Sequence, residues 1–420
     1  MGAVNRGHPA RPLKEPRGAL SLSTSSSDMS GYPHLPYSRR AIQRAGEVIA
    51  SNLPWNEETE PLIRDAFKIA NNWRDSHAFP MRSIRHSAIY YMRDVGLTGI
   101  TAARLKRMQA IRRKLRRFNY GLQQLQDLGG CRVILPTISD VERLVRTIKE
   151  RICHEIKTED NYLLEPKIDG YRSHHIIFSF SPKDSERAAY TGRRIELQVR
   201  TQLQHSWATA IEAVGLFRGE ELKNHQGSPE WLRLFKLMSA EFAEAERCPV
   251  APGTPSKMQR QEEVRHLAHS LDAVATLEKM IHGVRGTDIP LSPYSHRDYY
   301  LIRYDHATNT VYVEPLSKVA ATMLYHSAEE VMNRTDQDNE DIVLVEVDKI
   351  ENLKKAYPNY FGDVTIFGQQ LRALTQGESA AEYSVPPKQR PVQQRPGERI
   401  NPSWLKGSRF PKPSVRKKRK

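Results

Sequence analysis

The chain has 420 residues, of which 39% are hydrophobic, and a formal net charge of +15 at pH 7. This length suffices for two or three domains, and no apolar run is long enough to predict a membrane-spanning helix, so we expect no membrane partner. The positive charge favours an anionic partner such as a nucleotide, RNA or an acidic protein, without choosing among them.

Targeting and redox signals point to the cytoplasm as the expected location. The first residues lack the apolar core of a secretory signal. Three cysteines, Cys131, Cys153 and Cys248, are widely spaced, which fits neither a disulfide framework nor a paired set of metal ligands.

Composition and hydrophobic spacing divide the chain into six expected regions. They are a disordered leader (1–36), a helical N-terminal region (37–97), a central α/β domain (98–220), a helical connector (221–285), a small α+β domain with a possible regulatory role (286–376) and a disordered basic tail (377–420). The closing RKKRK fits either electrostatic affinity for RNA or a solvated tail without a role.

Residues 98–117 form the most basic segment expected to be ordered. Its apolar residues fall near one helical face: Leu105, Met108, Ile111 and Leu115. Lys and Arg cover the remaining positions, so the spacing predicts a basic helix. By itself, such a helix is compatible with a solvated face or with a surface that binds phosphates.

Three short runs rich in Val, Ile and Phe follow, and each predicts a strand. They are CRVIL (131–135), HHIIFSF (174–180) and RIELQVR (194–200). Apolar spacing over 138–153 predicts a crossover helix between the first two, and another helix is expected from Thr201 to about Val214. The expected fold class is α/β, with a mixed sheet flanked by helices.

Two carboxylates lie within this stretch. Asp127 stands just before the first strand, and Glu196 lies inside the third, between Ile195 and Leu197, which an alternating strand places on the opposite face. An acid within an apolar strand, as Glu196 is, is unusual, because burying an unpaired charge is costly. Carboxylates on neighbouring strands can share a hard cation such as Mg²⁺, and nearby Lys and Arg residues suit a polyphosphate substrate.

These segments also carry a resemblance to a known family. PKIDGYRSHH (166–175) and RIELQVRT (194–201), preceded by ARLKRMQAIRRKLRR (103–117) and QDLGGCRV (126–133), resemble the synthetase domain of the RelA/SpoT family of (p)ppGpp synthetases. The likeness covers roughly residues 100–215. Several blocks in the family's order make it specific, although any one block alone would be weak. The resemblance implies a nucleotidyltransferase-like sheet for residues 98–220.

The resemblance also implies a role for particular residues. Asp127 and Glu196 would hold Mg²⁺ and act in catalysis, and Glu196 would also draw the proton from the attacking hydroxyl group. The residues that would bind ATP are Arg104, Lys106, Lys114 and Arg132. The residues that would bind the acceptor are Lys167, Tyr171, Ser173, His175, Gln198 and Arg200. Two positions depart from the family: Ala110, where Ser is frequent, and Asp169, where Asn is frequent.

Each assignment has a plainer alternative. Asp127 would otherwise cap a turn, and Glu196 would otherwise form an ion pair with a neighbouring arginine. Tyr171 and His175 would otherwise pack in the core, and Lys167 would be solvated. For His205, at the start of the following helix, a role in the site and a role in helix packing stay open.

The rest of the chain shows no further catalytic constellation. Residues 261–281 predict one long helix with heptad-like apolar spacing, which fits core packing or contact with another copy, so a homo-oligomer stays open. Beyond it we expect a hairpin through HATN (306–309), a helix over 318–334, a strand over 341–348 and mostly helix afterwards. Three aromatic residues there fit either packing or a recognition surface: Tyr357, Tyr360 and Phe361.

The resulting expectation is a Mg²⁺-dependent pyrophosphokinase that transfers pyrophosphate from ATP to the 3′-hydroxyl of GDP or GTP, giving (p)ppGpp and AMP. The upstream region shows no His-Asp dyad of the hydrolase type, so we expect no alarmone hydrolysis. One alternative is a toxin that modifies the 3′ end of tRNA, with residues 286–376 as a neutralising or sensing module. Another is a catalytically inactive protein that binds nucleotides or RNA.

Overall fold

The structure is a computed structural model. It describes residues 35–51, 53–118, 120–220, 222, 227–283, 285–286, 299–305, 307–308, 310–335, 340–347, 350–361 and 363–384. Most of the expected leader and most of the expected basic tail lie outside these residues. None of the helices described is long and apolar enough to cross a membrane.

Strands from both halves of the described chain join in one mixed sheet, in the order β3-β4-β5-β2-β1-β9-β7-β8-β6. The strands are β1 (Ile100–Leu105), β2 (Gly129–Leu135), β3 (Glu155–Asn161), β4 (His174–Ser179), β5 (Arg194–Thr201), β6 (Arg285–Gly286), β7 (Tyr299–Asp305), β8 (Thr310–Leu316) and β9 (Glu340–Val347). β2 pairs with β5 in parallel and β6 with β8 in parallel, whereas the other described pairs are antiparallel. The α/β class with a mixed sheet flanked by helices is confirmed.

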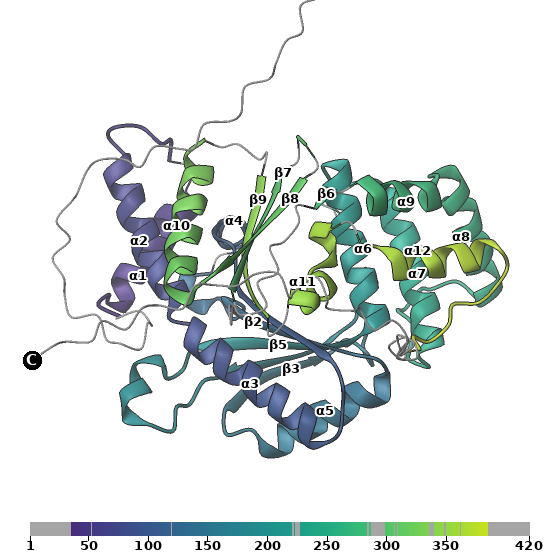
Figure 1. The fold of residues 1–420 in the computed structure, drawn as a ribbon, viewed down its shortest axis with the longest axis horizontal. Coiled ribbons are helices and arrows are strands. Elements are labelled where there is room, and N and C mark those ends of the chain that lie inside the picture. The colour runs from purple at the N-terminus through teal and green to yellow at the C-terminus, as the bar shows by residue number, and fades with distance from the viewer. Residues whose placement is uncertain are drawn as a thin grey trace, which may run out of the picture. The chain divides into compact units, whose positions relative to one another are not determined.

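The central strands follow the three predicted runs, and their two faces differ. Ile195, Leu197 and Val199 of β5 are fully buried and pack with helices α3 (Ala78–Asp94) and α5 (Ile138–Arg151). Glu196 and Gln198 alternate with them and therefore face the other side. Figure 1 shows α3 and α5 on one side of β5, and α6 (Gln202–Arg218) and α11 (Ile350–Ala356) on the other. The predicted crossover helix is α5.

An additional strand, β3, escaped the sequence prediction. Its residues EIKTEDN are mostly polar and exposed, because β3 lies at the edge of the sheet and pairs only with β4 among the described strands. A strand with little apolar patterning is held by its backbone hydrogen bonds to its neighbour, and such pairing leaves no trace in hydrophobic periodicity.

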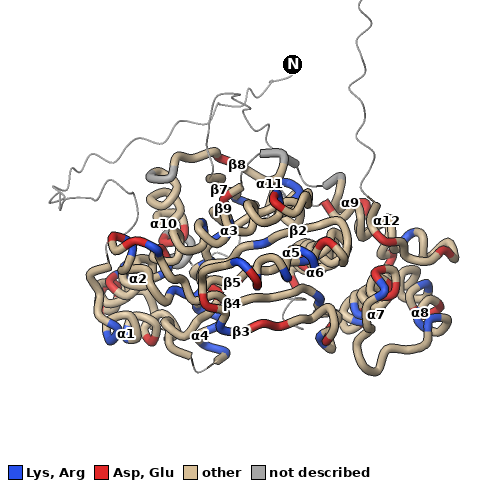
Figure 2. The backbone as a smooth tube through the Cα atoms, turned by 90° about the horizontal axis from the view of Figure 1, so that it is seen from below, with Lys and Arg blue, Asp and Glu red and all other residues tan. Residues whose placement is uncertain are grey.

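The prediction of one basic helix over 98–117 was wrong in its first half. Residues Ile100–Leu105 form β1, and only Met108–Arg117 form a helix, α4. β1 lies between β2 and β9, so backbone pairing on both edges overrides the local helical spacing. α4 buries Met108, Ile111 and Leu115 against α1 (Arg39–Ala50) and α2 (Glu60–Asp75). Figure 2 shows basic residues gathered along α4.

The connector region is helical and contributes a second core. α6, α7 (Pro229–Ala245), α8 (Lys257–Ser270), α9 (Ala273–Gly283) and α12 (Thr365–Thr375) pack together around Trp231, Phe235 and Phe367. The single helix predicted over 261–281 was wrong, because α8 ends before Asp272, whose φ of 46° is left-handed. Val264 and Leu277 are fully buried in this core, so the heptad-like spacing serves packing within the chain.

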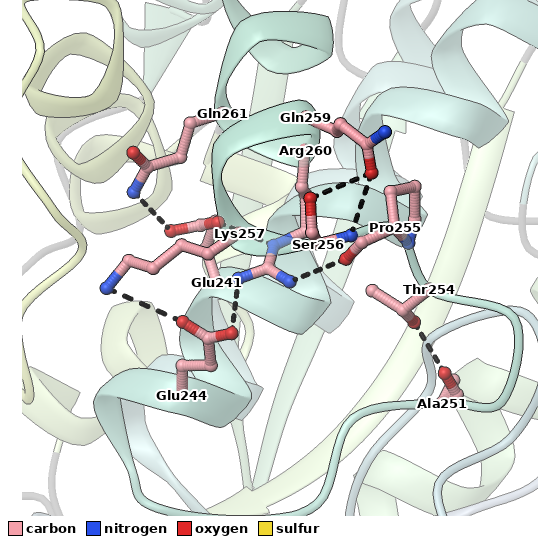
Figure 3. A network of polar contacts seen from close by, with 10 residues as sticks. All are labelled: Glu241, Glu244, Ala251, Thr254, Pro255, Ser256, Lys257, Gln259, Arg260 and Gln261. Carbon is pink, nitrogen blue, oxygen red and sulfur yellow. Dashed lines mark hydrogen bonds and ion pairs between the residues drawn. The ribbon is translucent and has the colours of Figure 1, made fainter.

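A buried ion pair joins α7 to α8. The Arg260 guanidinium donates to Glu241 and lies 2.6 Å from a carboxylate oxygen of Glu244, and Gln261 donates to the other oxygen of Glu241 (Figure 3). Arg260 and Glu241 are almost fully buried. Removing Arg260 would leave the buried charge of Glu241 uncompensated, so this pair fixes how α8 packs on α7.

The C-terminal strands extend the central sheet. β9 pairs with β1 through Ala102↔Val347 and Ala103↔Glu346, and the predicted hairpin is formed by β7 and β8. α10 (Lys318–Thr335) packs on one face of these strands, and α11 with the short helix Pro358–Phe361 packs on the other. The strand predicted over 341–348 is β9. The division of the chain into domains stays a prediction.

Candidate active site

A cavity of about 810 Å³ opens on the face of the sheet that does not pack on α3 and α5. Seven Lys or Arg residues and four Asp or Glu residues line it. Ten of the predicted site residues are among its walls: Arg104, Lys106, Asp127, Arg132, Lys167, Tyr171, His175, Glu196, Gln198 and Arg200. This excess of positive charge suits an anionic ligand.

Strand register explains why distant residues meet here. Arg132 on β2 is opposite Ala102 on one side and Gln198 on the other, and Gln198 is in turn opposite His175 on β4. Side chains opposite each other in neighbouring strands share a face. Arg132, Gln198 and His175 therefore project from one face, together with Glu196 and Arg200, which are two residues on either side of Gln198.

Asp127 binds two lysines with one oxygen. Lys106 Nζ and Lys114 Nζ each lie 2.9 Å from Asp127 Oδ2, whereas Oδ1 is buried and has no hydrogen-bond partner. Burial raises the pKa of Asp127, but the charges and hydrogen bonds of the two lysines outweigh it and hold the pKa below its usual value. The carboxylate is therefore ionised at neutral pH, with one oxygen available to a ligand.

Glu196 is the end of a hydrogen-bonded chain. His175 Nδ1 lies 3.0 Å from Glu196 Oε1, and the Tyr171 hydroxyl lies 2.8 Å from His175 Nε2. Gln198 Nε2 donates to Glu196 Oε2 over 2.9 Å. Burial raises the pKa of Glu196, but its contacts with His175 exceed this effect and the pKa is lowered. The described partners of Glu196 are thus His175 and Gln198 rather than an arginine.

A loop brings Lys167 and Tyr171 to the cavity. Lys167 Nζ lies 4.3 Å from the ring centroid of Tyr162 and 5.4 Å from that of Tyr171, within the range of cation–π contacts. Asp169, the position that departs from the family, accepts a 2.8 Å hydrogen bond from the Tyr171 backbone N–H. Its carboxylate thereby stabilises the turn of the loop.

Gly170 lets helix α7 approach this loop. Its φ is +92°, and a Cβ placed there would lie 2.9 Å from the Cβ of Ser239. The Ser239 hydroxyl donates to the Gly170 carbonyl. A side chain at position 170 would therefore displace the loop that carries Lys167 and Tyr171.

The last residue of α11 and the residue after it contact the cavity side chains from the C-terminal part of the chain. Arg132 Nη1 donates to the Ala356 carbonyl over 3.1 Å, and its guanidinium carbon lies 5.8 Å from the ring centroid of Tyr357, which lines the cavity. Burial lowers the pKa of Arg104, but the nearby Tyr360 and Tyr357 outweigh this and raise it. Tyr357 and Tyr360 are both buried in the core beneath β7–β9, as the packing interpretation predicts.

The donor set of the cavity fits a magnesium ion that also contacts a substrate. Asp127 and Glu196 provide carboxylate oxygens on neighbouring elements, and Asp127 Oδ1 is a buried acceptor without a partner. Among the described residues, no group of three or more His, Cys, Asp or Glu side chains could enclose a metal. Two carboxylates with substrate phosphates are a usual Mg²⁺ arrangement, because Mg²⁺ keeps several of its waters.

Two predicted residues lie beside the cavity rather than in its wall. Among the described residues, Lys114 contacts the site through Asp127. Ser173 is fully buried, and its hydroxyl donates to the Val199 carbonyl over 3.3 Å. The assigned roles of these residues stay predictions, as do those of the residues in the wall.

Several lining residues were missed from the sequence. Glu212 lies four residues after Ala208 on the same face of α6, so helical spacing counted from the strand motif could have found it. Arg233 and Lys236 come from α7 and Tyr357 follows α11, far along the chain. No local pattern marks these three, because only tertiary packing brings them to the cavity.

These features define an α/β domain with a cationic cavity and two ionised carboxylates. Residues 103–220 match the family model described as the region found in RelA / SpoT proteins. The matched segment is just over a quarter of the chain and contains all twelve predicted site residues. Eleven of them lie on β1, β2, β4, β5 and their loops, and Lys114 lies on α4. The resemblance read from the sequence is thus confirmed for residues 103–220, which are similar to the RelA / SpoT region.

Curated relatives match the same part of the chain. A GTP pyrophosphokinase of Bacillus subtilis, YwaC, is 30% identical over 115 residues, which are 26% of this chain and 54% of that protein. The B. subtilis GTP pyrophosphokinase YjbM is 26% identical over 109 residues, 25% of this chain and 51% of that protein. A GTP pyrophosphokinase of Escherichia coli is 24% identical over 160 residues, 37% of this chain and 20% of that protein. The chain thus spans about half the length of the first of these relatives.

Solved structures resemble part of the chain at low similarity. Small alarmone synthetase 2 from B. subtilis is 20% identical and covers 48% of this chain and 97% of its own, with a TM-score of 0.35. Small alarmone synthetase 1 from B. subtilis bound to pppGpp is 20% identical and covers 41% of this chain and 88% of its own, with a TM-score of 0.33.

Proposed function

We propose that the chain is a Mg²⁺-dependent pyrophosphokinase that transfers the β,γ-pyrophosphate of ATP to the 3′-hydroxyl of GDP or GTP and releases AMP. The observation that carries this proposal is the pairing of Asp127 and Glu196 in one cavity walled by Lys and Arg, within a RelA/SpoT domain. The names of the curated relatives support the same activity.

In the proposed reaction, the acceptor hydroxyl oxygen attacks the β-phosphorus of ATP, and the bond from that phosphorus to the oxygen shared with the α-phosphate breaks. Glu196 accepts the hydroxyl proton, since its lowered pKa keeps it ionised, and His175 and Gln198 hold its two oxygens in place. Bound Mg²⁺ would be held by Asp127 and Glu196 and would neutralise phosphate charge. AMP leaves with the electron pair of the broken bond.

The cations of the wall then divide between the two substrates. Arg104, Lys106 and Arg132 lie on or next to β1 and β2 and would bind ATP phosphates. Lys167 and Tyr171, from the loop beside α7, would bind the acceptor, with the Tyr171 ring available for stacking on a base. Positioning and charge stabilisation would supply most of the rate, as in other phosphoryl transfers.

The test is an acceptor panel. Full-length protein is incubated with γ-³²P-labelled ATP and Mg²⁺, with GDP, GTP or bulk tRNA in parallel. Label in a guanosine nucleotide is the expected result. Label in tRNA alone would replace the acceptor and favour the toxin interpretation. Nucleotide binding without label transfer to any acceptor would favour a catalytically inactive binding protein and contradict the proposal.

We further propose that the segment around α11 restrains ATP binding. Arg132 is engaged by the Ala356 carbonyl and the Tyr357 ring, so ATP has to compete with these contacts. Deleting residues 286–420 is a poor test, because it would remove β9 and leave β1 as an exposed edge strand. A point substitution at Tyr357 leaves the sheet intact.

Tyr357→Leu removes the aromatic face but keeps an apolar side chain. Since a cation–π contact contributes about 0.5–2 kcal/mol, kcat/KM for ATP should rise by roughly 2- to 30-fold. The matched control is Tyr304→Leu, another buried tyrosine of the same core on β7. Equal effects of the two substitutions, or a fall in kcat/KM only at Tyr357, would contradict the restraint.

A further inference from the structure

His205 connects the cavity to the C-terminal part of the chain. It is 1% exposed, near the start of α6. Its Nδ1 lies 2.6 Å from Arg200 Nη2, and its Nε2 lies 2.8 Å from the backbone carbonyl oxygen of Lys355. One of its partners therefore lines the cavity, and the other lies 150 residues further along the chain, in α11.

The two partners determine which ring nitrogen carries the proton. A guanidinium can only donate a hydrogen bond and a carbonyl can only accept one, so Nδ1 accepts from Arg200 and Nε2–H donates to Lys355. Burial, followed by the charges of Arg200 and Arg132, lowers the pKa of His205 well below its usual value. The imidazole is thus neutral, in a single tautomer.

Arg200 is held by few other groups. It is 2% exposed, and its Nε is buried without a hydrogen-bond partner. Besides His205, it interacts with the side chains of Tyr171 and Glu212. A guanidinium with a donor still unsatisfied can turn toward a phosphate, so its orientation depends strongly on the acceptor that His205 provides.

The end of α11 engages two cavity arginines in two ways. Arg132 donates directly to the Ala356 carbonyl, and Arg200 is linked to the adjacent Lys355 carbonyl through His205. The last carbonyls of a helix have no intrahelical partner, so these bonds satisfy them only while α11 is docked. Undocking would release Arg132 at once and would leave the Nε2–H of His205 without its acceptor.

We propose that His205 is a positioning residue that couples the docking of α11 to the orientation of Arg200. While α11 is docked, the imidazole is held by Lys355 and in turn holds Arg200. When α11 leaves, the ring loses its anchor and Arg200 becomes free to bind substrate phosphate. The effect of this coupling on the acceptor, which Arg200 would bind, rests on the proposed function, although the hydrogen-bonded link itself does not.

A double-substitution cycle measures the coupling. Tyr357→Leu, which loosens the α11 end, is combined with His205→Phe, which removes both hydrogen bonds, and with His205→Gln, which keeps one donor and one acceptor. The KM for the acceptor and the Kd of GDP are measured for each protein. The control is His174→Phe, a buried histidine on β4 that binds Glu159 outside the cavity.

We expect the effect of Tyr357→Leu to be smaller by about threefold or more in the His205→Phe background, and to be largely restored by His205→Gln. In the His174→Phe background it should be unchanged. Independent effects of Tyr357→Leu and His205→Phe, which multiply, would overturn the coupling. So would an equal loss of coupling with His174→Phe, since that would indicate a general loss of packing.

A spectroscopic readout separates the coupling from the proposed function. In protein labelled with ¹⁵N-histidine, the His205 signals, assigned with His205→Gln, should show a protonated Nε2 and an unprotonated Nδ1, and Tyr357→Leu should shift the Nε2–H signal. A protonated Nδ1, or an Nε2–H signal that Tyr357→Leu does not move, would overturn the inference even if the enzyme transfers pyrophosphate. The expected signals without any transfer would leave the link standing and contradict only the function.

Discussion

Replacing Glu196 by glutamine is the sharpest single test of the catalytic assignment. The substitution keeps the shape of the side chain but removes its charge. In the wild type, His175 Nδ1 lies 3.0 Å from one carboxylate oxygen and Gln198 Nε2 lies 2.9 Å from the other. In the variant an amide N–H₂ replaces one of these oxygens and faces one of the two donors. The variant therefore loses the proposed proton acceptor, one of the two proposed Mg²⁺ ligands and one of two well-placed hydrogen bonds.

The expected loss of kcat follows from the known effect of removing similar contacts in other enzymes. Removing one preorganised electrostatic contact to a transition state costs roughly 10²–10³ in kcat, about 2.7–4 kcal/mol. The lost hydrogen bond affects the fold much less, by about 1 kcal/mol. Glu196→Gln should therefore lower kcat at least a hundredfold, with only a small change in melting temperature.

The assay compares acceptor-dependent label transfer by Glu196→Gln and by Glu159→Gln. Glu159 is a matched control, because this carboxylate on β3 also binds a histidine, His174, at 2.9 Å but lies outside the cavity. Glu159→Gln should keep nearly full activity. The catalytic role of Glu196 is refuted if Glu196→Gln retains more than half of the wild-type kcat.

Three further predictions concern the fold and the acceptor loop. Arg260→Met leaves the buried carboxylate of Glu241 without its cation and should lower the free energy of unfolding by about 3–5 kcal/mol in urea titrations. Lys257→Met, at an exposed position in the same network, should change the free energy of unfolding by less than about 1 kcal/mol. Burial lowers the pKa of His77 to about 3 from 6.5. Between pH 3 and pH 6.5 the unfolded chain therefore binds a proton at His77 that the folded chain does not bind. The contribution of His77 to the free energy of unfolding is complete above pH 6.5 and should fall by up to about 1.4 kcal/mol per pH unit as the pH drops toward 3. His77→Gln should flatten that decline, and an unchanged pH profile would contradict the assignment. Gly170→Ala, which meets α7, should raise the acceptor KM about tenfold or more while leaving the ATP KM unchanged, and equal changes in both would count against the assignment of this loop to the acceptor.

Much of the site could be predicted because it is built from local patterns. Glu196, Gln198 and Arg200 alternate along one strand, so their common face follows from the period of two. Asp127 precedes a strand that pairs in parallel with β5, which brings the two carboxylates to one cavity. Lys167 and Tyr171, taken from the motif blocks, also line this cavity.

Other features depend on contacts that local patterns do not encode. Arg104 was predicted on a helix but lies on β1, because β2 and β9 pair with both of its edges. Tyr357 reaches the cavity only because the C-terminal strands extend the central sheet. For His205, the sequence left two interpretations open. The structure shows a buried imidazole bonded to a cavity arginine, so packing and the site meet in one residue.

In the proposed reaction two phosphoryl groups move as a unit, and the identity of the leaving nucleotide distinguishes this from transfer of a single phosphoryl group. Full-length protein is incubated with Mg²⁺, α-³²P-labelled ATP and GDP or GTP, and the labelled product is separated chromatographically. We expect labelled AMP, formed only with an acceptor present and in equal amount to the pyrophosphorylated acceptor. Labelled ADP would indicate transfer of a single phosphoryl group, and AMP formed equally without acceptor would indicate hydrolysis; either result would refute pyrophosphate transfer.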